Sequence, residues 1–254
     1  EWYRSKGIKD DANIYVKMNT EIFSNLTGNI DLQYRHINYS MQGTDDKFDS
    51  ETNKMRDIST LKPYIYNFFN PKLGLTYNIN SQQNIFASYS ISNREPNRNN
   101  YTESGKNDKP TYETLYDLEA GYRLQSAKFT ASANLYYMKY KNQLILTGKI
   151  SEIGELLTSN IPDSYRTGIE ISGNAVLTKW LKWGANINLS QNKILHFIEQ
   201  DVDMYDAEWN WIGSKDNELG TTDIAYSPNI VANNVFALNF NRFEIGLYSN
   251  YVGK

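Results

Sequence analysis

Residues 12–22 read ANIYVKMNTEI, and this stretch decides the fold. Every second position from Ala12 to Ile22 is apolar except Thr20, and mostly polar residues fill the positions between them. Because successive side chains of a β-strand point to opposite faces, this alternation predicts a strand with one apolar and one polar face. A short turn at residues 24–27 and a second alternating stretch at 29–35 follow, so the two stretches predict an antiparallel hairpin.

The same alternation occurs about ten times along the chain. The further stretches lie at residues 73–79, 85–91, 114–122, 129–137, 169–177, 185–189, 230–240 and 243–251. Short polar turns join the two strands of each predicted hairpin. Long connections separate the hairpins, at residues 42–62, 93–111, 141–164 and 193–227. Outer-membrane β-barrels have tilted strands of about 9 to 11 residues, short periplasmic turns and long extracellular loops, so the pattern predicts an all-β antiparallel barrel segment.

The amino-acid composition excludes several classes of protein. The chain has 254 residues without cysteine, which excludes a disulfide scaffold and thiolate metal sites. Its 26 basic and 29 acidic residues form no basic block, so nucleic acid is not an expected partner. No apolar run approaches the roughly 18 residues that span a bilayer as a helix. A membrane barrel still fits, because its strands average lipid-facing and lumen-facing residues.

The residues of the polar face favour a membrane barrel over a soluble alternative. The predicted apolar faces carry no charged residue, whereas the polar faces carry charges such as Lys17, Asp31 and Glu119 among Asn, Ser, Thr and Tyr. A soluble carbohydrate-binding or adhesive β-sandwich shows the same alternation and stays open as an alternative. A barrel requires one continuous outer surface that includes Ile14, Val16, Leu75, Ile85, Leu118, Leu135, Ile171, Leu189 and Leu238.

Three motifs carry a family resemblance. Residues 69–75 read FNPKLGL, residues 87–90 read ASYS, and residues 93–101 read NREPNRNNY. In this order the chain resembles the barrel of TonB-dependent outer-membrane receptors, and residues 160–170 (NIPDSYRTGIE) resemble a point where the chain re-enters that barrel. The resemblance implies a place in the outer membrane of a Gram-negative bacterium, in contact with its lipid. It also implies TonB-energised uptake of siderophore-iron, haem, cobalamin or a glycan.

The chain lacks some features of that family, so only part of a receptor is expected. Family members carry a plug domain, which engages TonB, and a 22-stranded barrel. This chain shows no plug-like region and about ten strands, so residues 1–254 are expected to form a single partial barrel domain without plug or closing strands. A passive porin or adhesin barrel is the alternative within membrane proteins. No catalytic motif occurs, so neither an enzyme nor a cofactor is expected.

Two groups of residues are the predicted ligand-binding site. Arg94, Arg98 and Tyr101 lie where a strand meets an outer loop, and two guanidinium groups there would hold an anionic ligand by charge-assisted hydrogen bonds. The structural alternative is that these arginines pair with Glu95, Glu103 or a plug carboxylate.

The second group, Tyr205, Trp209 and Trp211, provides rigid aromatic surface on which a flat or sugar-like ligand would stack. Carboxylates at 201, 203 and 206 have a spacing that suits Ca²⁺, but the glycine and the ligand order of an EF-hand are lacking, so a solvated acidic loop is expected. His36 and His196 are far apart in sequence. No metal site is predicted.

Overall fold

The computed structural model describes residues 4–49, 52–103, 109–150 and 156–253. These residues form twelve strands and one short helix: β1 (Arg4–Phe23), β2 (Leu26–Asp49), β3 (Lys54–Asp57), β4 (Tyr64–Asn80), β5 (Gln83–Arg94), α1 (Arg98–Glu103), β6 (Glu113–Gln125), β7 (Phe129–Ile150), β8 (Leu156–Val176), β9 (Leu181–Tyr205), β10 (Trp211–Asp223), β11 (Ile230–Phe240) and β12 (Phe243–Gly253). Over these ranges, no helix is long and apolar enough to cross a membrane.

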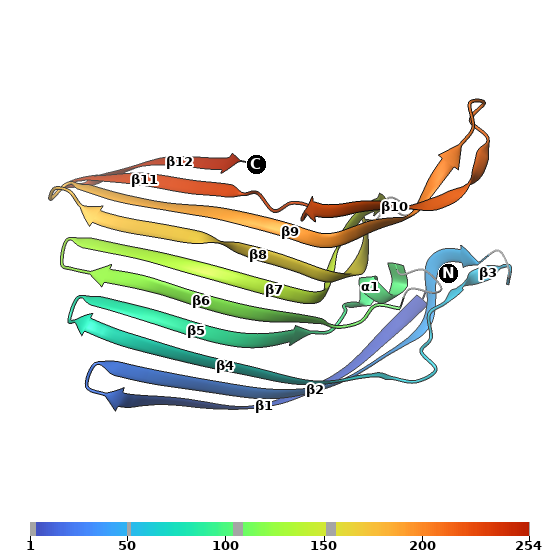
Figure 1. The fold of residues 1–254 in the computed structure, drawn as a ribbon, viewed down its shortest axis with the longest axis horizontal. Coiled ribbons are helices and arrows are strands. Elements are labelled where there is room, and N and C mark those ends of the chain that lie inside the picture. Colours follow the sequence, from blue (N-terminus) through green and yellow to red (C-terminus); the bar gives the residue numbers. More distant parts are fainter. Residues whose placement is uncertain (1–3, 50–51, 104–108, 151–155, 254) are drawn as a thin grey trace.

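All strands belong to one antiparallel sheet. Ten of them follow each other in the order β1-β2-β4-β5-β6-β7-β8-β9-β11-β12, while β3 pairs with β2 and β10 pairs with β9. Figure 1 shows the short turns gathered at one end of the sheet and the long hairpins at the other. The predicted antiparallel barrel segment, with alternating short and long connections, is confirmed.

Three of the four long connections, at residues 42–62, 141–164 and 193–227, differ from the expected loops, because most of their residues are in strands. β2 continues to Asp49 and pairs with β3, and β9 continues to Tyr205 and pairs with β10. β7 and β8 likewise stay paired as far as Ile150 and Leu156. In these extensions apolar residues no longer occupy every second position, so the period-two signal is lost although the backbone ladder continues.

Local side-chain chemistry accounts for the short turns. Asn241 and Arg242 alone join β11 to β12, and Asn241 has a φ of 47°. Two-residue hairpin turns need this left-handed conformation, which Asn tolerates better than most residues. In the β4–β5 turn, the Asn80 carboxamide oxygen accepts a bond of 2.9 Å from the backbone N–H of Gln82. These turns set the register of each hairpin.

The register places the apolar residues of successive strands in rows on one face. One row of cross-strand partners runs from β1 to β7 through Met18, Ile30, Leu73, Tyr89, Leu118 and Tyr137. Of the nine residues predicted to share an outer surface, eight are between 40% and 68% exposed, and Leu238 is partly buried. The described residues form a single sheet, so these side chains are not packed between two sheets as a β-sandwich requires.

Buried side chains gather instead near the end of the sheet with the long hairpins. Ile145, Ile161, Ile194 and Ile224 form a small core to which Phe197 is packed. This core joins β7, β8 and β9 to the segment that follows β10. It therefore holds the base of the β9–β10 hairpin in place.

Candidate ligand-binding site

The segment between β5 and β6 folds over the polar face of the sheet, and Tyr101 in α1 holds it there. Tyr101 is only 8% exposed. Its ring stacks on Tyr64 with 4.4 Å between centroids and lies 5.7 Å from the Tyr39 ring, and its hydroxyl bonds to that of Tyr66. Burial raises the pKa of the Tyr101 hydroxyl well above its usual range. The phenol therefore stays neutral and packs as part of a small aromatic core.

Polar contacts tie α1 to strands on both sides of it. Asn97 and Asn100 each donate a backbone N–H to the other's side chain, at 2.8 and 3.0 Å. The buried Asn100 also donates to the Thr158 hydroxyl of β8 at 2.7 Å. The carbonyl of Thr102 accepts bonds from Lys47 and Arg56, which belong to the β2–β3 hairpin. The segment thus bridges two regions of the sheet.

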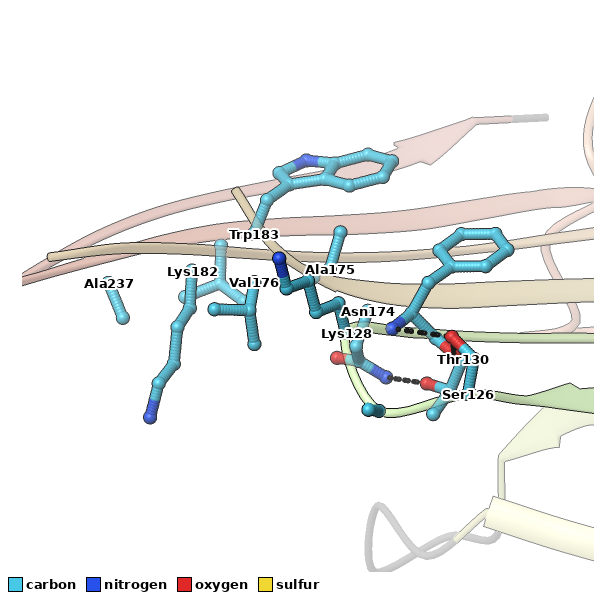
Figure 2. A pocket seen from close by; sticks show the side chains of 13 residues that line it. Ser126, Lys128, Thr130, Asn174, Ala175, Val176, Lys182, Trp183 and Ala237 are labelled. Carbon is cyan, nitrogen blue, oxygen red and sulfur yellow. Dashed lines mark hydrogen bonds between the residues drawn. The ribbon is translucent and has the colours of Figure 1, made fainter. Parts of the chain in front are cut away.

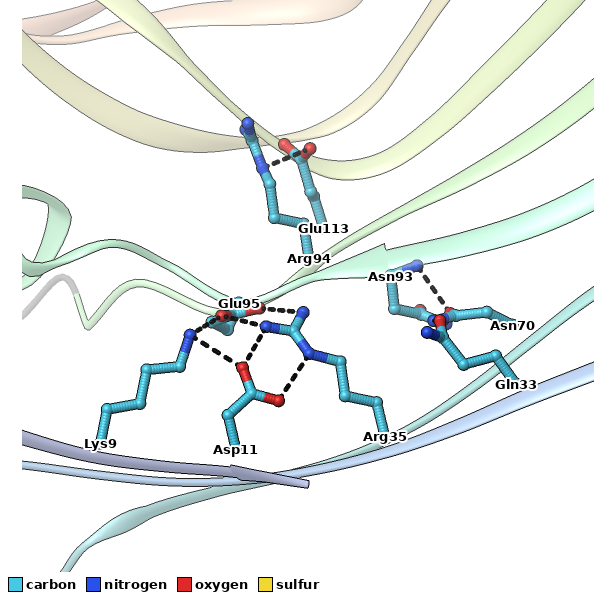
Figure 3. Close-up of polar contacts among 9 residues, drawn as sticks. All are labelled: Lys9, Asp11, Gln33, Arg35, Asn70, Asn93, Arg94, Glu95 and Glu113. Carbon is cyan, nitrogen blue, oxygen red and sulfur yellow. Dashed lines mark hydrogen bonds and ion pairs between the residues drawn. The ribbon is translucent and has the colours of Figure 1, made fainter. Parts of the chain in front are cut away.

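Four charged groups fix the start of this segment to β1 and β2 (Figure 3). Arg35 donates two hydrogen bonds to Asp11, of 2.6 and 3.0 Å, and two of 3.1 Å to Glu95. Lys9 donates to Glu95 at 2.6 Å and lies 3.3 Å from Asp11. Bidentate pairs combined in a network stabilise more than isolated surface pairs do.

This network lies beyond the apolar band of the sheet. At its level the lipid-side positions of β1 and β2 are Asp10, Ala12, His36 and Asn38, of which only Ala12 is apolar. The hydrogen bond from Arg35 lowers the pKa of Asp11 to about 2. Asp11 therefore stays ionised, and the network intact, over the whole range of ordinary pH.

Arg94 and Arg98 have partners other than those expected. Arg94 forms an ion pair of 2.9 Å with Glu113 of β6, apart from the network that holds Glu95 (Figure 3). The alternative in which Arg94 pairs with Glu95 is therefore wrong, because Glu95 faces Lys9 and Arg35. Arg98 donates to the Ser5 hydroxyl of β1. The side chain of Glu103 lies outside the described residues.

The second predicted group lies at the tip of the β9–β10 hairpin and is exposed to solvent. Tyr205, Trp209 and Trp211 are 50%, 82% and 61% exposed. Trp209 has a φ of 62°, which is uncommon for a bulky residue. Its ring centroid lies 6.2 Å from that of Tyr205, and the Trp211 indole N–H donates to Asp203 at 2.9 Å. The tip therefore presents oriented aromatic rings to solvent.

The acidic groups of the tip stabilise its turn. Asp206 accepts hydrogen bonds from the backbone N–H groups of Glu208 and Asn210, at 3.0 and 2.8 Å. The bond from Asn210 is the main cause of a lowered Asp206 pKa. The side chain of Asp201 lies outside the described residues. Across the ranges that are described, no three His, Cys, Asp or Glu residues are placed to hold a metal ion.

The structure does not bring the two predicted groups together. Arg94, Arg98 and Tyr101 lie at α1 and the strand before it, whereas the β9–β10 tip projects away from α1 (Figure 1). Sequence reasoning also missed the residues that hold the segment in place. Tyr64 and Tyr66 could have been found, because their alternation places both on the polar face. The partners of Glu95 could not, because they lie 60 and 86 residues away in sequence.

Comparison with known proteins gives one family. A family model described as TonB dependent receptor-like, beta-barrel matches residues 2–254. No curated protein sequence matches the chain.

Solved structures with a similar fold include the ferric yersiniabactin uptake receptor FyuA from Yersinia pestis, with a TM-score of 0.68 and 14% identity over 99% of this chain and 36% of that one. The siderophore receptor PiuA from Acinetobacter baumannii has a TM-score of 0.70 and 13% identity, over 98% and 34%. The copper transporter OprC has a TM-score of 0.71 and 12% identity, over 97% and 35%. The chain thus spans about a third of each of these structures, and the likeness shows the fold.

Proposed function

Because the chain belongs to the family of TonB-dependent receptor β-barrels, we propose that it forms part of the wall of a receptor that takes up a scarce nutrient. Members of this family are outer-membrane proteins of Gram-negative bacteria. They are receptors and transporters rather than enzymes. The observation that carries the proposal is the family match over residues 2–254, on a sheet whose apolar face is exposed in the described residues.

The two faces of the sheet then have different surroundings. The apolar face contacts lipid and the polar face lines the lumen, with the short turns on the periplasmic side. Strands β1 and β12 form the two edges of the described sheet. An unpaired edge in a bilayer costs several kcal/mol for each unsatisfied backbone group. We therefore propose that residues 1–254 are one partial barrel domain of a longer protein, which supplies the closing strands and a plug domain that engages TonB.

We propose that ligand capture takes place at the end with the long hairpins. Tyr205, Trp209 and Trp211 are the exposed surface that a ligand meets first, and stacking on their rings would hold it there. Arg94 has a largely exposed guanidinium on the lumen side, which offers charge-assisted donors deeper in the mouth. Tyr101 and Arg98 contribute by holding the segment beside Arg94 in place. The cargo belongs to one of four classes: siderophore-bound iron, haem, cobalamin or a glycan.

Uptake by the complete receptor tests this proposal. Replacing Trp209 and Trp211 together by Ala should weaken capture by about 0.5 to 1.5 kcal/mol per lost contact, which is roughly a 2- to 12-fold loss for each ring. The readout is growth of a strain that depends on this receptor for the limiting nutrient. Tyr226→Ala is the matched control, because Tyr226 is an equally exposed aromatic residue outside the tip, and Gln82→Ala is a control in a periplasmic turn. Equal growth of the tip variant and both controls would refute the role of the tip.

Dependence on TonB separates this proposal from a passive porin or an adhesin. Deleting TonB should abolish uptake through the receptor at low nutrient concentration, whereas a passive pore would be unaffected. Uptake that persists without TonB would therefore favour the porin alternative.

A further inference from the structure

A hollow of about 320 Å³ lies in the lumen-facing wall, next to the periplasmic turns. Its wall includes Asn174 of β8, Lys182 of β9, and Val235 and Ala237 of β11. Figure 2 shows these β8 and β9 side chains on one side of the sheet and Trp183 on the other. The hollow opens toward the lumen, because β11 contributes the lumen-facing Val235 and Ala237 but not Phe236 between them, which pairs with Trp183 in the lipid-facing row.

Two lysines flank the hollow, and neither has a partner of opposite charge among the described residues. Lys128 comes from the β6–β7 turn and Lys182 from the start of β9, and both are exposed. By contrast, Lys17 on the same face lies 4.0 Å from Asp31. The rim of the hollow therefore carries two positive charges that an anionic group can neutralise.

Gly184 keeps the hollow open. A Cβ at this position would lie 2.7 Å from the Asn174 carboxamide oxygen and 3.2 Å from a methyl carbon of Val235. The resulting volume lies at the lower end of the range for ligand sites, about 300 to 1,000 Å³. Its floor is largely apolar, with Val176, Val235 and Ala237 among its residues. This combination suits one aliphatic side chain next to a carboxylate better than a whole ligand.

We infer that this hollow is a docking site for an acidic peptide segment of the domain that fills the barrel. The segment inserts an aliphatic side chain between Val235 and Ala237, and its neighbouring Asp or Glu pairs with Lys128 or Lys182. The inference rests on the proposed function, since only a barrel with an internal domain places a peptide at this point of the lumen. It adds the place of contact and the chemistry of the partner segment.

Carbodiimide coupling in isolated outer membranes that contain the complete receptor tests the inference. The reagent joins a lysine amine to a carboxylate in contact with it, and the linked peptides are identified by mass spectrometry. Lys128 and Lys182 should couple to an Asp or Glu outside residues 1–254, next to an aliphatic residue. Lys179, which is exposed in a neighbouring turn but does not line this hollow, is the baseline for incidental coupling.

Two variants separate binding from simple proximity. Ala237→Leu fills the hollow and should lower the coupling yield at both lysines about threefold. Lys128→Glu should lower the yield at Lys182 by a similar factor, because one attractive charge becomes repulsive, whereas Lys128→Arg should leave it unchanged. Coupling no greater than at Lys179, coupling only to acidic residues within residues 1–254, or yields that Ala237→Leu does not change would each overturn the inference. The assay uses neither nutrient nor TonB, so a failure of uptake does not affect its outcome.

Discussion

Tyr101 offers the sharpest test of how the segment between β5 and β6 is held. Its ring is 8% exposed and packs against Tyr64 and Tyr39, and its hydroxyl bonds to Tyr66. Tyr101→Ala removes a buried aromatic ring, which costs about 3 kcal/mol at such sites. Tyr101→Phe keeps the ring and loses one hydrogen bond, which costs about 1 kcal/mol. The two variants therefore separate the ring from the hydroxyl.

Because the barrel wall does not depend on this ring, the loss should appear as local opening of the segment rather than as unfolding of the sheet. Each 1.4 kcal/mol changes an equilibrium tenfold, so Tyr101→Ala should raise the opening of residues 97–102 about 100-fold and Tyr101→Phe about fivefold. Hydrogen–deuterium exchange of the complete receptor in liposomes measures this, with Tyr226→Ala as a control on an exposed ring without a ring partner among the described residues. Exchange in Tyr101→Ala that equals the control, or that equals Tyr101→Phe, would show that the ring does not hold the segment.

Three further predictions concern the two faces of the sheet, the close contact at Gly121 and the ion pair of Asp11. Leu75→Lys puts a charge on the lipid-facing row and should lower the free energy of unfolding by about 2 to 4 kcal/mol near the bilayer midplane. Thr76→Lys on the lumen side should cost little. The folded fraction of each variant in liposomes, measured by heat-modifiable electrophoretic mobility, distinguishes the two. Gly121→Val should destabilise by about 1 to 3 kcal/mol in urea unfolding, because a Cβ would lie 2.6 Å from the backbone oxygen of Ala133; an unchanged midpoint would contradict this contact. The pKa of Asp11 is lowered from 3.8 to about 2, so its contribution to stability is complete above pH 3.8 and is lost as the pH falls through 2. Protection factors of the Glu95 and Asn97 amides, which correct for the pH dependence of intrinsic exchange, should therefore fall only below about pH 3 in the parent protein and be lower already at neutral pH in Asp11→Asn.

The strands and their faces could be predicted because the signal is local. From Ala12 to Ile22 the polarity of most residues indicates the face of the sheet on which they lie, because nearly every second residue faces lipid and is apolar. The alternation of apolar and polar residues stops where the strands leave the lipid. Beyond that level neither face of β9 and β10 contacts lipid, so the strand extension up to Tyr205 has no apolar period and was expected to be loop.

The site was less predictable because its contacts are between distant parts of the chain. The aromatic tip is made of neighbours in sequence, so Tyr205, Trp209 and Trp211 could be grouped in advance. The role of Tyr101 depends on rings from β2 and β4, and that of Glu95 on Lys9 and Arg35, and no short pattern joins them. Whether the exposed rings bind a ligand stays a prediction.

β10 lies between β9 and β11 in sequence, although β9 pairs with β11 in the sheet. This insertion affects the order in which the sheet assembles. Most strands pair with a neighbour that follows after a short turn, so each pairing closes a small loop, and such local contacts form fast. The pairing of β9 with β11 instead joins Leu189 to Ile230, and closing a loop of about 40 residues rather than about 4 costs about 2 kcal/mol more in chain entropy. When β10 has zipped onto β9, Asp223 already lies opposite Lys193, and Ile224 enters the small isoleucine core with its N–H bonded to Asn192. Only residues 225–229 then remain to be closed, so the projecting hairpin acts as the folding template for the last two strands.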